Sequence, residues 1–247
     1  MAVFLLVHGG FSGSWIWKKV APLLRAAGHE AHHPSLPGMG DRATEISPEI
    51  DLHTHIDDVC RLVQDILPTR VTLVASSYGG FVASGVLHRI PEALDQVIFN
   101  DALIPEPGLT LQDLLGPVAP MMLERAMARG DGWRVPAPAP PPGWTDFPLC
   151  DQPLATMETA LPLDNPKAAE VPCTYIRCTG EKPEVHPDGV GVIESHAARA
   201  ASRGWPMIDL DASHNSEWSK PAELTELLIE LASPQRPVRD EESSSTE

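Results

Sequence analysis

The chain reads Val71-Thr72-Leu73-Val74-Ala75-Ser76-Ser77-Tyr78-Gly79-Gly80 ahead of a second apolar segment. The run rich in Val, Leu and Thr predicts a short buried strand, which stops at a cluster of small residues. Residues 81–88 then carry apolar side chains without turn signals, as a buried helix does. A strand, a sharp turn and a helix, with a serine at the turn, form the context of a nucleophile elbow.

The small residues around this turn distinguish its two serines. The usual pattern is G-x-S-x-G, because the residues flanking the nucleophile of so tight a turn must be small. Ser77 has Ala75 two residues before it and Gly79 two after it, whereas Ser76 has the bulkier valine and tyrosine at those distances. We therefore expect Ser77 to be the nucleophile. A strand end that merely packs against a helix is the alternative, so the rest of the chain must supply a base, an acid and an oxyanion hole.

The composition is that of an acidic globular protein. The 247 residues are 43% hydrophobic and 21% charged, and their formal net charge is -16. This acidity argues against nucleic acid and anionic membranes as partners, because both need a basic face. The length suits one domain with a large core, or one domain with an inserted subdomain.

Signals for export, membrane insertion and metal binding are not expected. Residues 1–7 lack a basic region and a cleavage site and predict a strand, and no apolar run approaches the ~20 residues of a membrane span. The four cysteines, at 60, 150, 173 and 178, show no metal-ligand spacing. A reduced, cytoplasmic chain is therefore the expectation.

Apolar periodicity predicts strands that alternate with helices. Besides the strand before the elbow, strands are expected at 3–7, 30–33, 96–100, 172–178 and 205–210, and helices at 15–27, 51–67, 189–201 and 220–231. This alternation predicts an α/β fold, with a mainly parallel sheet and helices on both faces. Such sheets carry their sites at the carboxyl ends of the strands.

The pattern changes between residues 105 and 168. One or two helices are expected within 109–127 and another within 149–161, whereas the proline-rich stretch 130–148 predicts irregular chain and not a sheet strand. We interpret 105–168 as a small cap inserted into a core of 1–104 and 169–232. Trp144 and Phe147 support a packed cap. Residues 233–247 predict a disordered acidic tail.

The remaining catalytic groups are assigned by position. His214 follows the last predicted strand and is the expected base, while Gly10 and Tyr78 are expected to supply the backbone N–H groups of an oxyanion hole. His8 is expected to hold the glycine-rich loop by hydrogen bonds. The acid stays open between Asp101, which ends a strand, and Glu181, in the loop after the next strand where the acid more usually lies. Asp188 and Asp211 are weaker alternatives.

Several motifs together resemble the α/β-hydrolase superfamily. Within it, the chain is similar to the small esterases grouped with plant methylesterases and hydroxynitrile lyases, and to their bacterial relatives. The motifs are Leu6-Val7-His8-Gly9-Gly10, Ser14-Trp15-Ile16-Trp17, Ala26-Ala27-Gly28-His29, Ala75-Ser76-Ser77-Tyr78-Gly79-Gly80, Asn100-Asp101-Ala102-Leu103-Ile104-Pro105 and Ser213-His214.

This resemblance implies Ser77 as nucleophile, His214 as base, Gly10 and Tyr78 as oxyanion donors, and no metal or organic cofactor. Hydroxynitrile lyases of the group carry a threonine and a lysine where this chain has Gly9 and Asn215. An asparagine supplies no cation for a departing cyanide, so cyanohydrin lysis is disfavoured.

The expected function is hydrolysis of a small-molecule carboxylic ester by a serine esterase. The alternatives are an amide, carbamate or lactone hydrolase with the same residues, or a non-catalytic small-molecule-binding protein on the same fold. We expect the cap to form an apolar substrate pocket. The sequence leaves a homodimer open. The expected pocket residues are Trp15, Leu103, Met121, Met122 and Trp133.

Overall fold

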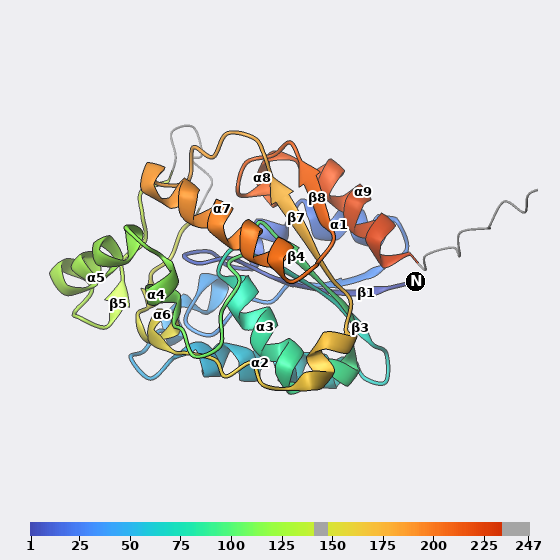
Figure 1. Cartoon of the computed structure of the whole chain (residues 1–247), viewed down its shortest axis with the longest axis horizontal. Helices are drawn as coiled ribbons and strands as arrows, with labels where there is room; N and C mark the ends of the chain where they lie inside the picture. The colour runs from blue at the N-terminus through green and yellow to red at the C-terminus, as the bar shows by residue number, and fades with distance from the viewer. Residues whose placement is uncertain (141–147, 234–247) are drawn as a thin grey trace, which may run out of the picture.

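A six-stranded sheet forms the centre of the molecule in a computed structural model, which describes residues 1–140 and 148–233 (Figure 1). Its strand order is β2-β1-β3-β4-β7-β8, and every pairing between neighbouring strands is parallel. The sequence prediction of an α/β fold with a parallel sheet is thus confirmed. The strands are β1 Val3–Val7, β2 Glu30–His32, β3 Val71–Ser76, β4 Leu94–Asn100, β7 Cys173–Cys178 and β8 Met207–Leu210.

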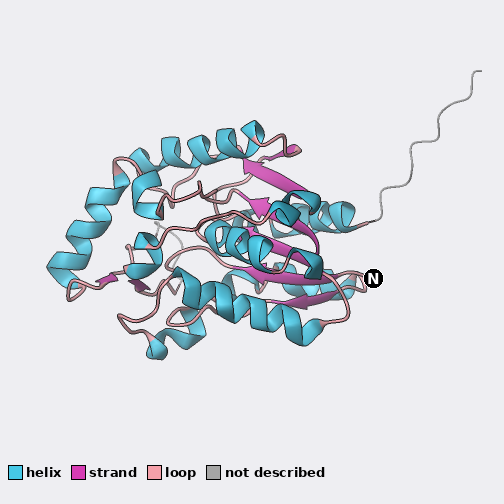
Figure 2. Cartoon of the chain, turned by 60° about the horizontal axis from the view of Figure 1, so that its bottom comes forward, coloured by secondary structure: helices cyan, strands magenta, loops and turns pink. Residues whose placement is uncertain are grey.

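Helices cover both faces of this sheet, as the two views show (Figures 1 and 2). Alternate residues of β1 enter different cores: Leu5 packs with α2 and α3, whereas Phe4 packs with α1 and α9. This division explains why β1 and β3 are almost wholly apolar, since both of their faces are buried. The main helices are α1 Val20–Ala26, α2 Leu52–Ile66, α3 Gly79–Arg89, α7 Pro187–Ser202 and α9 Pro221–Ala232.

Two of the predicted helices are interrupted. The expected helix at 15–27 is a 3₁₀ turn, η1 (Ser14–Trp17), followed by α1, and the short helix α8 (Ser216–Ser219) precedes α9. By contrast, α2 begins where the sequence indicates, because Asp51 and Thr54 cap its first turn reciprocally.

In the segment between β4 and β7, the elements α4 to α6 lie at the left of Figure 1, beyond the carboxyl ends of the strands, whereas the last part of the segment runs back beside α3 to the start of β7. It contains α4 (Leu111–Leu114), α5 (Val118–Arg129), α6 (Ala155–Glu158) and the 3₁₀ turn η4 (Pro166–Glu170). The expected helix at 149–161 is therefore only four residues long.

A two-stranded sheet in this segment corrects the prediction that 130–148 contains no strand. β5 (Arg134–Val135) pairs antiparallel with β6 (Gln152–Pro153). Strand pairing is compatible with the prolines here because the ladder is two residues long and needs no N–H from a proline at its end. Trp144, Phe147 and the expected acidic tail from residue 234 onward lie outside the described residues.

Within the described residues, no helix combines the length and the apolar character that crossing a bilayer requires.

Candidate active site

The turn after β3 places Ser77 in a strained conformation at the carboxyl edge of the sheet. Ser77 has a φ of 51°, in the left-handed region that favours glycine. Its neighbours are small because backbone crowds them. A Cβ on Gly79 would lie 2.8 Å from the carbonyl oxygen of His8, and one on Gly80 would lie 2.3 Å from that of Leu103. The turn therefore requires glycines where the sequence has them.

His214 joins Ser77 to Asp101 by two contacts. The His214 Nε2 atom lies 3.0 Å from Ser77 Oγ, and His214 Nδ1 lies 2.8 Å from Asp101 Oδ2. A carboxylate only accepts hydrogen bonds, so Nδ1 carries the proton in this pair and a neutral ring leaves Nε2 to accept from the serine hydroxyl. This is the tautomer that a general base needs.

Asp101, and not Glu181, lies beside the histidine. Asp101 is completely buried, and its Oδ1 accepts a hydrogen bond of 3.1 Å from the backbone N–H of Cys178. The Glu181 side chain is exposed in the loop after β7, as are Asp188 and Asp211 further along the chain. The sequence left both acids open because β4 and β7 are neighbouring parallel strands, so the chain leaves both at the same edge.

The surroundings of His214 raise its pKa above the ordinary value. Burial alone lowers the pKa, but the hydrogen bond and negative charge of Asp101, with the charges of Glu184 and Glu217, outweigh that effect. Glu217 is itself buried, and burial raises its pKa to about 7. The histidine therefore lies in an acidic environment that stabilises its protonated form.

The expected oxyanion donors lie next to the serine. Gly10 and Tyr78 line the same cavity as Ser77 and His214. The Tyr78 side chain points away into the core, where its hydroxyl lies 2.8 Å from His55 Nδ1. Gln152 Oε1 accepts a 3.2 Å hydrogen bond from the N–H of Phe11, next to Gly10. The expected hole is thus flanked by a buried polar contact at Tyr78 and a partly buried one at Phe11.

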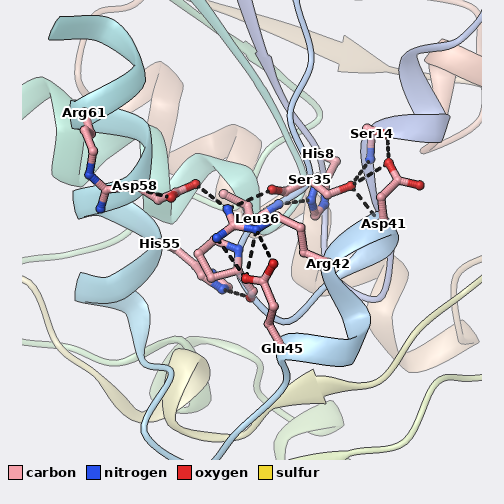
Figure 3. A network of polar contacts seen from close by, with 11 residues as sticks. His8, Ser14, Ser35, Leu36, Asp41, Arg42, Glu45, His55, Asp58 and Arg61 are labelled. Carbon is pink, nitrogen blue, oxygen red and sulfur yellow. Dashed lines mark hydrogen bonds and ion pairs between the residues drawn. The ribbon is translucent and has the colours of Figure 1, made fainter. Parts of the chain in front are cut away.

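His8 supports the glycine-rich loop from below, within the polar network of Figure 3. Its Nε2 accepts a 3.0 Å hydrogen bond from the N–H of Leu36, so its Nδ1 is the donor to the carbonyl of Gly9 at 2.8 Å. Burial lowers the pKa of His8 to about 4, which keeps the ring neutral. The Ser35 hydroxyl extends this network, because it contacts Asp41 and accepts a hydrogen bond from the N–H of Ser14, the first residue of η1.

The cavity at Ser77 is small and mainly apolar, with a volume of about 310 Å³. Leu103, Met121 and Met122 line it as the sequence predicts, but Trp15 and Trp133 do not. Because η1 interrupts the first helix, Trp15 packs edge-on against Trp218 with ring centroids 6.4 Å apart. Trp133 instead lies beside Arg134, whose guanidinium carbon is 5.8 Å from the centroid of the Trp133 ring.

Comparison with known proteins identifies the family. The Alpha/beta hydrolase family model matches residues 4–227. The chain belongs to the Alpha/beta hydrolase family. It is 30% identical to the carbendazim hydrolyzing esterase of Nocardioides sp. (strain SG-4G), over 94% of this chain and 100% of that protein. It is also 30% identical to polyneuridine aldehyde esterase of Rauvolfia serpentina, over 44% of this chain and 41% of that protein.

A solved structure of an extracellular alpha/beta-hydrolase from a Paenibacillus species has the same fold. It superposes with a TM-score of 0.76 at 18% identity and covers 93% of this chain and 98% of its own. The likeness extends over both the sheet and the segment between β4 and β7.

The sequence did not reveal three polar groups at the site of this hydrolase. Gln152 and Glu184 line the cavity and His55 holds Tyr78, but each lies far along the chain from the elbow. A single sequence gives no signal that would bring such distant positions together. Among the described residues, no group of three or more His, Cys, Asp or Glu side chains is arranged to hold a metal ion.

Proposed function

We propose that this chain is a serine hydrolase that cleaves small carboxylic esters. The observation that carries the proposal is the continuous contact from Ser77 Oγ through His214 to Asp101, at 3.0 and 2.8 Å. The full-length relative and the plant relative, both named as esterases, support ester bonds as the target.

Acylation begins when the Ser77 hydroxyl attacks the ester carbonyl carbon. His214 Nε2 takes the hydroxyl proton, and Asp101 stabilises the resulting imidazolium through Nδ1. The N–H groups of Gly10 and Tyr78 stabilise the negative charge that develops on the carbonyl oxygen. The positive end of the α3 dipole lies at the same point and favours that charge. The tetrahedral intermediate collapses as the imidazolium gives its proton to the leaving alcohol.

Deacylation repeats these steps with water as the nucleophile. His214 takes a proton from the water that attacks the acyl-enzyme and returns it to Ser77 Oγ as the acid departs. The bond broken is the acyl C–O bond, and no oxidant or cofactor enters the balance.

The cavity limits the size of the substrate. A volume of about 310 Å³ lined by Leu103, Met121, Met122 and Val192 suits a compact apolar ester. Residues 105–168 act in this proposal as a cap that selects the substrate. Amide, carbamate and lactone hydrolysis use the same residues, and carbendazim belongs in the test panel because of the relative named for it. Lysis of a cyanohydrin is disfavoured because Asn215 follows the base.

The test is turnover of p-nitrophenyl acetate and of a panel of esters, lactones, anilides and carbendazim. We expect Ser77→Ala to lose turnover and Asp101→Asn to lower kcat by roughly 10²-fold or more, because an unheld histidine takes the wrong orientation. Glu181→Gln, in an exposed position, is the matched control and should keep the wild-type rate. Stoichiometric retention of a ligand without turnover would favour the binding-protein alternative, and loss of activity in Glu181→Gln alone would refute the assignment of the acid.

A further inference from the structure

The loop after β7 brings a lysine to the buried acid. Lys182 Nζ lies 3.5 Å from Asp101 Oδ2, the same oxygen that lies 2.8 Å from His214 Nδ1. The Lys182 side chain is only 7% exposed and that of Asp101 is 0% exposed. Lys182 also donates a hydrogen bond to the carbonyl oxygen of Cys178. Its ammonium is therefore fixed between the end of β7 and the carboxylate.

Burial of both charges needs an explanation, because lysine is rarely buried unless it is paired. Asp101 lies where its charge is desolvated, and its other oxygen accepts a 3.1 Å hydrogen bond from the Cys178 N–H. An ammonium against the carboxylate offsets much of this desolvation. Cys178, the last residue of β7, thus donates its N–H to Asp101 and accepts a hydrogen bond from Lys182 with its carbonyl oxygen, so both charged groups bond to the same backbone position.

We propose that Lys182 is a positioning residue, whose ammonium holds the Asp101 carboxylate in line with His214 Nδ1. The inference rests on the function proposed above. The proposal also gives a role to the loop after β7, where the acid is more usual. In this chain Glu181 of that loop is exposed, and the loop instead contributes the Lys182 ammonium, which contacts Asp101.

The proposal predicts opposite electrostatic effects from two residues of one loop. A positive charge near a histidine lowers its affinity for a proton, so we expect Lys182 to act in this direction on His214. Glu184, whose Oε1 accepts a 2.8 Å hydrogen bond from the N–H of Asn215, raises that affinity. Charged and titratable groups around Asp101 and His214 come from four parts of the chain. They are Asp101 after β4, Tyr175 and Cys178 on β7, Lys182 and Glu184 in the loop after it, and Glu217 on α8.

The experiment compares the pH dependence of kcat/KM in the wild type, Lys182→Met, Lys182→Arg and Glu184→Gln. We expect the acidic limb of Lys182→Met to move upward by about 0.5 to 1 pH unit, and that of Glu184→Gln to move downward. We also expect kcat of Lys182→Met to fall about 5- to 50-fold with KM little changed, because the Asp101 carboxylate keeps its hydrogen bond to His214 Nδ1 but holds the ring in a wider range of orientations. Lys182→Arg keeps the charge and should restore most of both properties.

A second readout does not need turnover. The pKa of His214 measured by imidazole NMR, assigned with His214→Ala, should rise in Lys182→Met and fall in Glu184→Gln. If the wild type hydrolyses no ester, the proposed function fails, but this titration still decides the role of Lys182.

The proposal would be overturned by an unshifted pKa of His214 in Lys182→Met, by a shift in the same direction for Lys182→Met and Glu184→Gln, or by full activity in Lys182→Met. If Lys182→Met does not fold, the double variant Asp101→Asn/Lys182→Met must fold, because it leaves no unpaired buried charge. Failure of both variants to fold would likewise contradict the proposed pairing.

Discussion

Ser77 holds its hydroxyl at the cost of an unfavourable backbone conformation. Its φ of 51° is one that a residue with a Cβ adopts only under constraint, here from the crowded glycines around the turn. We predict that Ser77→Gly is more stable than Ser77→Ala by about 1 kcal/mol, because only glycine adopts this φ without strain. Urea unfolding of the two inactive variants measures the difference, and equal midpoints would show that the turn is unstrained.

At the residue scale, the sequence pointed to Ser77 and His214, which the structure brings into contact, because each has a local signature. Ser77 lies between small residues, and His214 follows the last strand. The acid had no such signature, since Asp101 and Glu181 follow neighbouring strands and only the side-chain geometry separates them. Lys182 and Glu184 were equally hidden, because the two residues lie in one polar loop and the sequence does not say which side chain turns inward.

At the scale of elements, α8 places a carboxyl group where water cannot reach it. Glu217 is 1% exposed, and burial raises its pKa to about 7 against the opposing effect of a hydrogen bond to Ser76. In the unfolded chain the group ionises near its ordinary value of about 4.3, so between these two values only the folded state holds the proton. The stability contributed by this residue therefore falls as pH rises from about 4.3 to 7.

Replacement of Glu217 by Gln removes the ionisable carboxyl group and should raise the free energy of unfolding at alkaline pH. We predict that Glu217→Gln increases the free energy of unfolding by about 1 to 3 kcal/mol at pH 8 and by much less at pH 5. Urea denaturation at the two pH values measures it, with Glu223→Gln on the exposed first turn of α9 as the control. A gain that does not depend on pH would contradict the account.

Elements were predicted well where the pattern of apolar residues along the chain is sufficient to define them. All six strands of the main sheet lie close to the expected ranges, because buried parallel strands read as apolar runs. The errors fall where tertiary contacts decide. β5 and β6 are two residues each and exist only through their mutual pairing, and η1 interrupts a helical pattern so that Trp15 can pack on Trp218. Neither contact is encoded in local periodicity.

At the scale of the whole molecule, the formal net charge of -16 favours repulsion between this chain and anions. We predict that a half-ester bearing a free carboxylate is a poorer substrate than the matched neutral diester at low salt. Its kcat/KM should rise a few-fold as ionic strength increases, because screening shortens the reach of the repulsion. Parallel salt series for the two esters test this, and identical salt dependence would show that the net charge does not influence the encounter.

The central claim is that one hydroxyl, on Ser77, performs the chemistry with His214 as its base. A fluorophosphonate probe followed by mass spectrometry of the modified peptide tests it most directly. The account predicts a single stoichiometric label on Ser77, slowed in His214→Ala and lost in Ser77→Ala together with hydrolysis of p-nitrophenyl acetate. A Ser77→Ala variant that still accepts the label and still cleaves the ester would contradict it.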